Sequence, residues 1–212
     1  MNRALVMIPS RDRPRQLDEA VKSVLDTSEA DVAVYIDDDQ QGYYGTADHP
    51  RVKQVFGPRV GPAGATNILV DRFQDYAAYG LVTDDSQITT AGWDQWLLHQ
   101  LDQYTDRLLV VSPSHNHGRH VDMPFLSKEW VRVLGWFALP RTIQYGWPTA
   151  VYVMALEIGR LKRAPEEAFH IQHSELSPDR YIHFVADSAT LYNFFISGMY
   201  ESVLKLRAAM KQ

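Results

Sequence analysis

Short apolar runs alternate with amphipathic stretches along the first half of the chain, and this alternation restricts the possible folds more than any other feature. The apolar runs cover residues 4–8, 31–37, 51–56, 81–83 and 108–111. The stretch between the first two runs is expected to be a helix over about residues 14–26, because apolar side chains recur there at helical spacing: Leu17, Ala20, Val21, Val24 and Leu25. Regular alternation of strand and helix predicts an α/β fold with a mostly parallel central sheet flanked by helices.

The second half of the chain is less regular, and its elements are predicted one at a time. Further helices are expected after the glycine-rich segment at residues 57–64 and around Trp93, and residues 123–130 indicate a strand that passes into a short helix. Residues 148–160 are predicted to be helical, and residues 168–173 a short strand. A long amphipathic helix is expected to close the chain, with an apolar face formed by Tyr192, Phe195, Ile196, Met199 and Val203.

Composition narrows the class of protein. The 212 residues suit one domain, residues 1–212, and no repeat or linker divides them. Because the chain has no cysteine, a bound metal would be held by oxygen or imidazole. No apolar stretch approaches the roughly 18 residues that span a bilayer, and the first apolar run is too short for a secretory signal. We therefore expect a soluble, cytoplasmic protein without a membrane span. Its net charge of -5 gives no overall attraction to nucleic acid.

Polar residues follow three of the predicted strands at the point where each strand ends. Residues 9–11 (PSR) follow the first run, residues 37–39 (DDD) close the second, and Asp84 and Asp85 follow the run at residues 81–83. The carboxyl ends of parallel strands lie on one edge of a sheet, and open α/β sheets bind their ligands there. The sequence therefore predicts a nucleotide site at this edge, with backbone donors for phosphate at the helix start GPAGATN (residues 61–67).

Each of these signals also has an ordinary structural interpretation. The Asp84-Asp85 pair also suits a helix cap or a solvated turn, residues 37–42 (DDDQQG) an acidic loop, and GPAG a simple turn. The convergence of three signals on one edge favours a binding site. The fingerprints of dinucleotide-binding and P-loop proteins are missing, because no G-x-G-x-x-G follows the first run and no Walker A lysine motif occurs.

Taken in order, the segments ALVMIPSRDRP, VYIDDD, GPAGATN, LVTDDSQITTAGWD, PFLSKEWVRVLGWF and FHIQHSE resemble a known family. The chain is similar, from about Ala4 to Glu175, to nucleotide-sugar glycosyltransferases of the GT-A fold, close to the family 2 type. The resemblance implies a GT-A-like, Rossmann-like fold with a C-terminal helix. It also implies a UDP- or GDP-sugar donor, a divalent metal (Mn²⁺ or Mg²⁺), and transfer of the sugar to an acceptor.

The resemblance assigns roles to particular residues. Pro9, Ser10 and Arg11 match the family's first nucleotide-binding loop, which also contains Arg13. Asp37 matches the aspartate that contacts the base. The remaining matches are a polar residue after the glycine loop and the acidic metal motif, at Asn67, Asp84 and Asp85.

The acidic metal motif departs from the family pattern in its first position. That motif is usually D-x-D, and its first position here is Thr83. Asp85 is therefore the predicted metal ligand, and Asp84 is predicted to contact the nucleotide sugar. His173 stands where related enzymes place a histidine that completes the metal site.

A second departure concerns the general base. Inverting members of the family carry a carboxylate just before the helix predicted here at residues 148–160, and this chain has Trp147 at that place. Trp147 is then either a core residue or a stacking platform for the acceptor. Asp122 is our candidate catalytic carboxylate. It follows a cluster of histidines, His115, His117 and His120, whose alternative interpretation is a solvated polar loop.

Three classes of function remain open from the sequence. The first is a metal-dependent glycosyltransferase, and the second is a nucleotide-sugar-binding module without turnover. The third is a nucleotidyltransferase, which is disfavoured because PSRDRP lacks the expected glycine- and lysine-rich phosphate loop. The acceptor is open: glycan, lipid, protein or a modified nucleic-acid base, the last being the only expected role for nucleic acid. A basic lip beside the donor is possible from Arg11, Arg13, Arg15, Arg51, Lys53 and Arg59.

Overall fold

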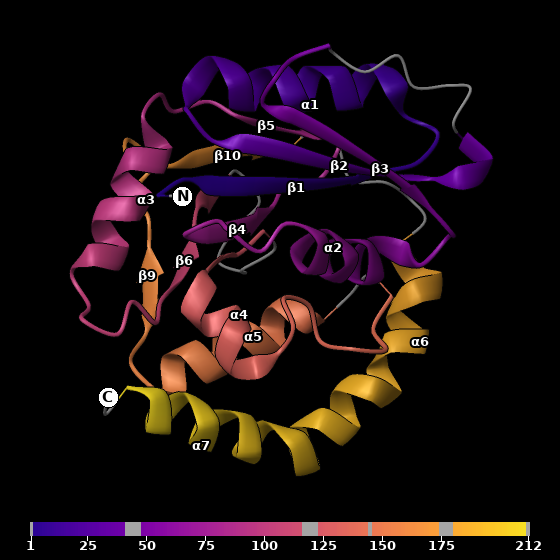
Figure 1. Cartoon of the computed structure of the whole chain (residues 1–212). Coiled ribbons are helices and arrows are strands. Elements are labelled where there is room, and N and C mark those ends of the chain that lie inside the picture. The colour runs from indigo at the N-terminus through magenta and orange to yellow at the C-terminus, as the bar shows by residue number, and fades with distance from the viewer. Residues whose placement is uncertain (1, 41–47, 116–122, 144–145, 174–179, 211–212) are drawn as a thin grey trace.

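A computed structural model describes residues 2–40, 48–115, 123–143, 146–173 and 180–210, and it confirms an α/β fold with a mostly parallel central sheet (Figure 1). The sheet has seven strands, in the spatial order β3 (Val52–Gly57), β2 (Asp31–Asp37), β1 (Ala4–Ser10), β4 (Ala78–Leu81), β8 (Phe125–Ser127), β6 (Val110–Ser112) and β9 (Leu161–Arg163). Neighbouring strands are parallel, except that β8 is antiparallel to both β4 and β6.

Helices cover both faces of this sheet (Figure 1). One layer contains α1 (Pro14–Thr27) and α3 (Trp93–Asp102). The other contains α2 (Gly61–Arg72), α4 (Lys128–Leu134), α5 (Trp147–Glu157) and α7 (Met199–Ala209). Strand β1 belongs to both layers, because successive side chains of a strand point to opposite faces. Val6 and Ile8 pack in the first layer, and Leu5 and Met7 in the second.

The order of the strands creates a switch point beside β1. The chain adds β2 and β3 on one side of β1 and then crosses to place β4 on the other side. Pairing of β1 with β4 ends at Met7 opposite Leu81, whereas pairing with β2 continues to Ser10 opposite Ile36. Pro9 therefore lies beyond the last β4 rung, where its missing N–H costs no hydrogen bond to that strand. Ligands bind at such switch points in open α/β sheets.

A small second sheet, which the sequence analysis does not predict as a sheet, extends the carboxyl edge of the first. It consists of β5 (Ser86–Ile88), β10 (His170–His173) and β7 (Ser114–His115). Strand β10 is antiparallel to β5 and parallel to β7. The strand predicted at residues 168–173 is thus confirmed, and its place is beside the turn that carries Asp84 and Asp85.

Besides a longer β1, which ends at Ser10, and a β3 that covers Val52–Gly57, two strands differ from the expected boundaries. The strand predicted at residues 81–83 is observed at residues 78–81, and the one predicted at residues 108–111 is observed at residues 110–112. The first difference arises because the chain leaves the sheet early. The N–H of Val82 makes a last bond to the carbonyl of Met7, and a turn then closes with the N–H of Ser86 on the carbonyl of Thr83 at 3.0 Å.

The predicted apolar face of the closing helix is wrong for three of its five residues. The segment consists of α6 (Arg180–Asn193), a π-helical turn (Phe194–Gly198) and α7. Because a π turn takes one residue more than an α turn, it rotates the following face. Phe194 and Met199, five residues apart, pack against the core together with Val203. The misplaced residues face solvent at 67%, 36% and 66% exposure: Tyr192, Phe195 and Ile196.

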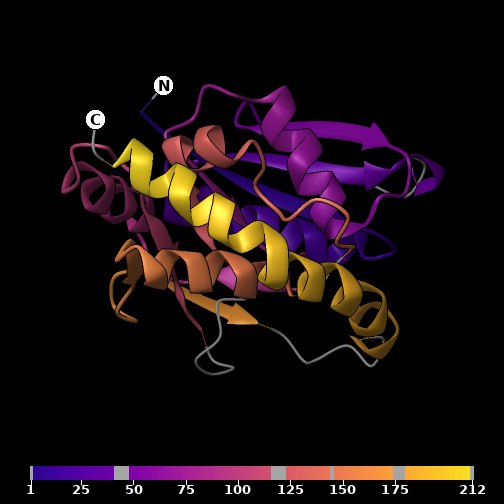
Figure 2. The ribbon, with the colours of Figure 1, turned by 90° about the horizontal axis from the view of Figure 1, so that it is seen from below.

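The C-terminal segment packs on the layer that contains α2, α4 and α5. Figure 2 shows α7 running diagonally across the layer that contains α4 and α5, and α7 contacts both of these helices. Val203 and Leu206 are the buried side chains of α7. The expected C-terminal helix packed on the sheet layers is therefore confirmed. Among the described residues, no helix has the length and apolarity to cross a bilayer.

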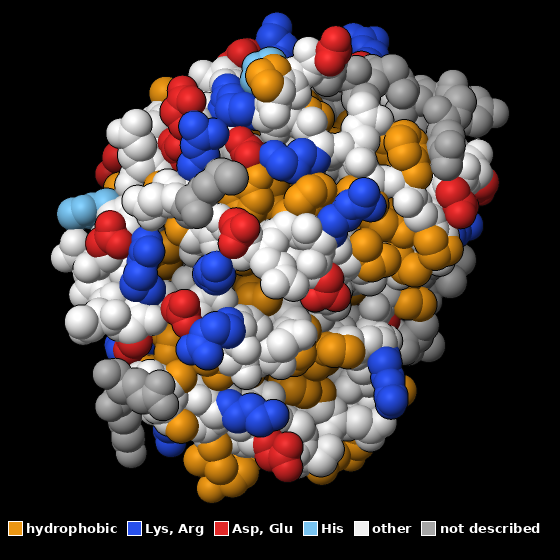
Figure 3. All heavy atoms as spheres, viewed as in Figure 1, with side chains coloured by type: hydrophobic (Ala, Val, Ile, Leu, Met, Phe, Trp, Pro, Cys, Tyr) orange, Lys and Arg blue, Asp and Glu red, His pale blue; other side chains and the backbone are white. Residues whose placement is uncertain are grey.

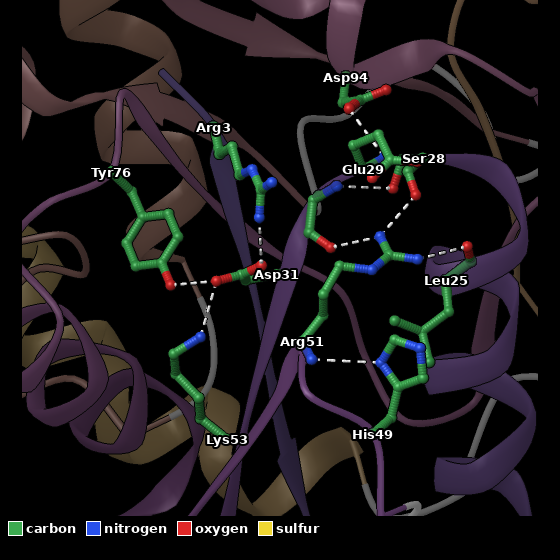
Figure 4. Close-up of polar contacts among 11 residues, drawn as sticks. Arg3, Leu25, Ser28, Glu29, Asp31, His49, Arg51, Lys53, Tyr76 and Asp94 are labelled. Atoms are coloured by element: carbon green, nitrogen blue, oxygen red, sulfur yellow. Dashed lines mark hydrogen bonds and ion pairs between the residues drawn. The ribbon is translucent and has the colours of Figure 1, made fainter. Parts of the chain in front are cut away.

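The amino ends of the strands are fastened by side-chain contacts (Figure 4). Arg51 donates to the carbonyls of Leu25 and Ser28 at the end of α1, which lack helical partners, and to the carbonyl of Ala30 just before β2. Lys53 donates to Asp31 at 2.7 Å. Arg51 and Lys53 therefore lie at the edge opposite to the predicted donor site, and the expected basic lip does not include them.

Charges of both signs lie on the face of the molecule that Figure 3 draws. Figure 3 shows Lys and Arg side chains interspersed with Asp and Glu on the face that it draws. This distribution agrees with the modest net charge of -5. An interspersed surface of this kind gives little long-range attraction to a polyanion.

Candidate functional site

Three strand ends meet at the switch point. Ser10 ends β1, Asp37 ends β2, and Asp84 and Asp85 lie in the turn between β4 and β5. Because β1 lies between β2 and β4, the loop after Ser10 has one acidic cluster on each side. The structure therefore brings together the three polar segments that the sequence predicts at one edge.

The loop between β1 and α1 links the two clusters. Asp12 has a φ of 58°, in the left-handed region that aspartate tolerates better than most residues. Its N–H donates to Oε1 of Gln40 at 3.3 Å, which ties the loop to the 3₁₀ turn after β2 (Asp38–Gln40). Arg11 and Arg13, on either side of Asp12, reach different clusters.

Arg11, Asp37 and Asp39 form the first cluster, called here the Arg11 group. One guanidinium nitrogen of Arg11 donates to Oδ2 of Asp37 at 2.8 Å and to Oδ1 of Asp39 at 2.7 Å. The second donates to Oδ2 of Asp39 at 2.8 Å. Asp37 is buried, whereas Asp39 is exposed. The bidentate contact with Asp39 matches the planar fork of a guanidinium.

Arg13, Ser10, Asp84, Asp85 and His173 form the second cluster, called here the Arg13 group. Nη1 of Arg13 donates to Oδ1 of Asp84 at 3.2 Å and to Oδ2 of Asp85 at 2.9 Å. The hydroxyl of Ser10 donates to Oδ2 of Asp84 at 2.7 Å. Nε2 of His173 lies 3.4 Å from Oδ1 of Asp85. Two adjacent carboxylates at a strand end are thus accommodated by a guanidinium.

Strand register explains why His173 and Asp85 meet although 88 positions separate their numbers. In the small sheet, His173 of β10 pairs with Ser86 of β5. Ser86 directly follows Asp85 in the sequence, so the antiparallel pairing places the imidazole beside the carboxylate. The predicted neighbourhood of Asp85 and His173 is present in the structure.

The two clusters hold their carboxylates in different electrostatic environments. Burial raises the pKa of Asp84 above its usual range, and the hydrogen bond from Ser10 and the charge of Arg13 offset this only in part. The hydrogen bond from Arg11 lowers the pKa of Asp39. The Arg11 group therefore contains an exposed carboxylate, Asp39, whose charge is stabilised by the arginine, and the Arg13 group contains a carboxylate, Asp84, whose negative charge is disfavoured by burial.

Two side chains of the Arg13 group, Asp85 and His173, are of types that could hold a divalent metal ion. Asp85 offers a carboxylate oxygen and His173 an imidazole nitrogen 3.4 Å apart. That separation suits two ligands of one ion, each about 2.0–2.2 Å from it. No group of three or more His, Asp or Glu side chains converges within the described parts of the chain. An ion here would thus complete its coordination with oxygens from a ligand or from water.

Asn67 has a structural role that the sequence analysis does not anticipate. Its Oδ1 accepts hydrogen bonds from the N–H groups of Phe137 and Ala138, and its Nδ2 donates to the carbonyl of Ala138. Asn67 therefore fastens the segment after α4 to α2. These contacts lend no support to the predicted contact with a nucleotide.

The predicted phosphate cradle at the start of α2 is partly occupied. The N–H of Ala63 donates to the carbonyl of Ile143 at 3.0 Å, and Pro62 has no N–H. Gly61 has a φ of 72° and lies against Ile143, where an added Cβ would stand 2.8 Å from a side-chain carbon. This glycine allows close approach of another chain segment, and the helix start offers fewer phosphate donors than expected.

The candidate catalytic residues have separate outcomes. Trp147 is fully buried and packs against Phe137 with ring centroids 5.3 Å apart. Trp147 is therefore a core residue, and stacking on an acceptor is excluded. Asp122, His117 and His120 lie outside the described residues. His115 is described and belongs to β7.

Sequence reasoning missed that the two loop arginines bind the acidic clusters themselves. The resemblance assigns Arg11 and Arg13 to nucleotide binding, whereas here each guanidinium contacts aspartates of its own cluster. The number of acidic residues is the available signal, since five aspartates at the ends of two strands on one edge of the sheet require nearby cations. The motif R-x-R in PSRDRP supplies two of them.

Comparison with known proteins by sequence identifies no relative. No family model matches the chain, and no curated protein matches it.

Comparison by structure identifies similar folds. The chain is similar to Staphylococcus aureus TarS, with a TM-score of 0.61 and 12% identity over 95% of this chain and 42% of the TarS chain. It is also similar to the mannosyltransferase PcManGT from Pyrobaculum calidifontis, solved in complex with GDP-mannose and Mn²⁺. That match has a TM-score of 0.58 and 14% identity over 98% of this chain and 73% of the other.

The fold follows from these likenesses. The chain has a GT-A-like glycosyltransferase fold, as the sequence resemblance implies. It spans less than half the length of TarS.

Proposed function

We propose that the protein is a glycosyltransferase that binds a UDP- or GDP-sugar together with Mn²⁺ or Mg²⁺ and transfers the sugar to an acceptor. One observation carries this proposal: the Arg11 group and the Arg13 group flank the end of β1 at the switch point of a GT-A-like fold. A nucleoside on one side and a diphosphate with its cation on the other would match these two groups. The GDP-mannose and Mn²⁺ bound by PcManGT support the same ligand class.

The first part of the proposal assigns the nucleoside to the Arg11 group. Asp37 is buried at the end of β2 and its carboxylate accepts hydrogen bonds, so it can accept one from an N–H of the base or a ribose hydroxyl. Pro9, Ser10 and Arg11 line the same edge from β1 and its loop. Arg11 holds one oxygen of Asp37 at 2.8 Å and so orients the carboxylate before any ligand arrives.

The second part assigns the metal to Asp85 and His173. A bound Mn²⁺ or Mg²⁺ would offset negative charge on the departing diphosphate. The imidazole favours Mn²⁺, because nitrogen ligands suit the softer of the two ions. Asp84 is proposed to contact the nucleotide sugar, and its bond from Ser10 holds it at the end of β1.

The transfer itself breaks the bond between the anomeric carbon and the phosphate oxygen and forms a bond from that carbon to the acceptor. The acceptor loses a proton in this step, so an inverting reaction needs a general base. Buried Trp147 cannot serve in this way. Asp122 remains our candidate for the base, and the acceptor class stays open.

A second candidate function is nucleotide-sugar binding without turnover. The observation that favours it is Trp147, a fully buried side chain where the family resemblance implies a carboxylate. A chain of this kind would keep the donor site and lack the transfer step.

A panel of nucleotide sugars tests both functions. Thermal shift is measured with UDP- and GDP-sugars, with and without Mn²⁺, and donor hydrolysis is then followed for the ligands that stabilise the protein. Metal-dependent stabilisation together with slow release of the nucleoside diphosphate is expected for a glycosyltransferase. Stabilisation without hydrolysis or transfer supports the binding module. No stabilisation by any nucleotide sugar contradicts both.

A further inference from the structure

The backbone of Arg13 is held on both sides. Pro14 follows it, and the residue before a proline is kept out of the helical region, as its φ of -135° and ψ of 52° reflect. Its carbonyl accepts the first hydrogen bond of α1, from the N–H of Leu17 at 2.9 Å. The guanidinium therefore extends from a fixed point at the start of a helix whose face is buried in the core.

The contacts of Arg13 divide the oxygens of the acidic pair between different partners. On Asp84, Oδ1 faces Nη1 of Arg13 and Oδ2 accepts from Ser10. On Asp85, Oδ2 accepts from the same nitrogen at 2.9 Å, and Oδ1 faces Nε2 of His173 at 3.4 Å. A carboxylate held by one oxygen in this way has a defined orientation for the other.

The arginine and the imidazole thus approach Asp85 through different oxygens. An arginine that occupied the place of the metal ion would contact Oδ1 of Asp85, the oxygen that faces His173. Arg13 contacts the other oxygen, so an ion between Asp85 and His173 leaves the bond from Arg13 in place. The positive charge of Arg13 also offsets the negative charges of Asp84 and Asp85, which would otherwise repel each other at a largely buried position.

We propose that Arg13 is a positioning residue for the metal pair: by holding Oδ2 of Asp85, it keeps Oδ1 directed at the imidazole of His173. This inference rests on the proposed function, since it assumes that Asp85 and His173 bind a divalent cation. It differs from the expectation drawn from the family resemblance, in which Arg13 contacts the donor directly. Removal of a residue that hydrogen-bonds to a metal ligand and orients it typically weakens metal binding 10- to 100-fold.

The direct test is Mn²⁺ binding in the absence of any nucleotide, measured by electron paramagnetic resonance and by titration calorimetry. We expect Arg13→Gln to weaken Mn²⁺ binding about 10- to 100-fold relative to the unaltered protein. Arg13→Lys keeps the charge and is expected to restore part of the affinity. Lys22→Gln removes the same charge from an exposed position of α1 and is expected to leave the affinity unchanged.

The outcomes separate this inference from the proposed function. If the unaltered protein binds Mn²⁺ and Arg13→Gln binds it equally well, Arg13 does not position the metal pair and only this inference fails. Tighter binding by Arg13→Gln would mean that the arginine competes with the ion, which also overturns it. If the unaltered protein does not bind Mn²⁺ either alone or with UDP or GDP added, the metal part of the proposed function fails together with the inference. Thermal melting of each variant, and the recovery in Arg13→Lys, exclude misfolding as the cause of a loss.

Discussion

Strand β2 carries a buried aspartate at each end, and the two are held in different ways. At the amino end, Asp31 receives hydrogen bonds from Lys53 and Tyr76 and pairs with Arg3 (Figure 4). At the carboxyl end, Asp37 receives its bond from Arg11, which belongs to the loop after β1. Both aspartates face a cation, but only the second lies at the switch point of the sheet.

The difference between the two ends indicates which carboxylates hold the fold together and which serve a ligand. Lys53 is in β3 and Arg3 directly precedes β1, so the partners of Asp31 come from the sheet or its immediate flank. Burial alone raises the pKa of Asp31, but the bonds from Lys53 and Tyr76 outweigh it and leave that pKa below its usual range. We therefore expect mutations at the amino end to change stability, and mutations at the carboxyl end to change binding.

The largest effect is expected from the metal pair at the carboxyl end. Asp85→Ala should lower Mn²⁺-dependent donor turnover by roughly 100-fold or more, because the loss of a ligand exceeds the 10- to 100-fold cost of losing an outer partner. Asp71→Ala removes an exposed carboxylate from α2 and is the matched control. Turnover is measured by nucleoside diphosphate release at saturating donor. If Asp85→Ala keeps full metal-dependent turnover, the two ends do not differ in the way proposed.

The next effect concerns the nucleoside. Asp37→Ala should weaken nucleotide binding by about 1–3 kcal/mol, through loss of a hydrogen bond to a group that is buried in the complex. Titration calorimetry with UDP and GDP measures this change. Asp38→Ala alters the neighbouring exposed carboxylate and should bind as the unaltered protein does. Unchanged affinity in Asp37→Ala would assign the base to another residue.

The amino end should show the opposite pattern. Asp31→Ala is expected to lower the free energy of unfolding by about 1–2 kcal/mol, a modest loss because Arg3 and Lys53 are partly exposed to solvent. Nucleotide affinity should be unchanged. Because the pKa of Asp31 is lowered in the folded state, this stability is present above the unfolded pKa and is lost as the pH falls below about 4. Urea denaturation at pH 7 and at about pH 2.5, below the unfolded pKa, checks both statements. A loss of nucleotide affinity without a loss of stability would reverse the comparison.

The smallest effect is a gain in stability at the carboxyl end. Asp84 has a raised pKa in the folded state, so its charge opposes folding once the pH exceeds that value. Asp84→Asn removes this cost and is expected to raise the melting temperature slightly at pH 7, with a smaller gain as the pH is lowered and the aspartate of the unaltered protein takes up a proton. Thermal melting as a function of pH provides the measurement. A lower melting temperature at pH 7 would show that the bond from Arg13 matters more than the burial of charge.

Much of this arrangement was predictable from the sequence because it depends on strand ends. Parallel strands share a carboxyl edge, so the clusters after β1, β2 and β4 were expected to meet there, and they do. The resemblance placed His173 near Asp85, and the structure has them 3.4 Å apart. Their joint binding of a metal stays a prediction.

Other features depend on contacts between distant segments that no local pattern encodes. The register of β10 on β5 decides which residue faces Asp85, and one position of slip would turn His173 away. The resemblance assigns Asn67 to ligand binding. Its structural role depends on bonds to Phe137 and Ala138, which are about 70 positions away in the sequence, so no local pattern predicts it. The π turn at Phe194–Gly198 redirected a face that the α-helical period places toward the core.

The central claim is that the end of β1 separates a nucleoside site from a metal site, and one measurement tests it most directly. A crystal of the protein grown with Mn²⁺ and UDP or GDP is examined at a wavelength where manganese scatters anomalously. We expect an anomalous peak in contact with Oδ1 of Asp85 and Nε2 of His173, and the base of the nucleotide beside Asp37. A manganese peak away from Asp85, or a nucleotide bound at the amino ends of the strands, would contradict it.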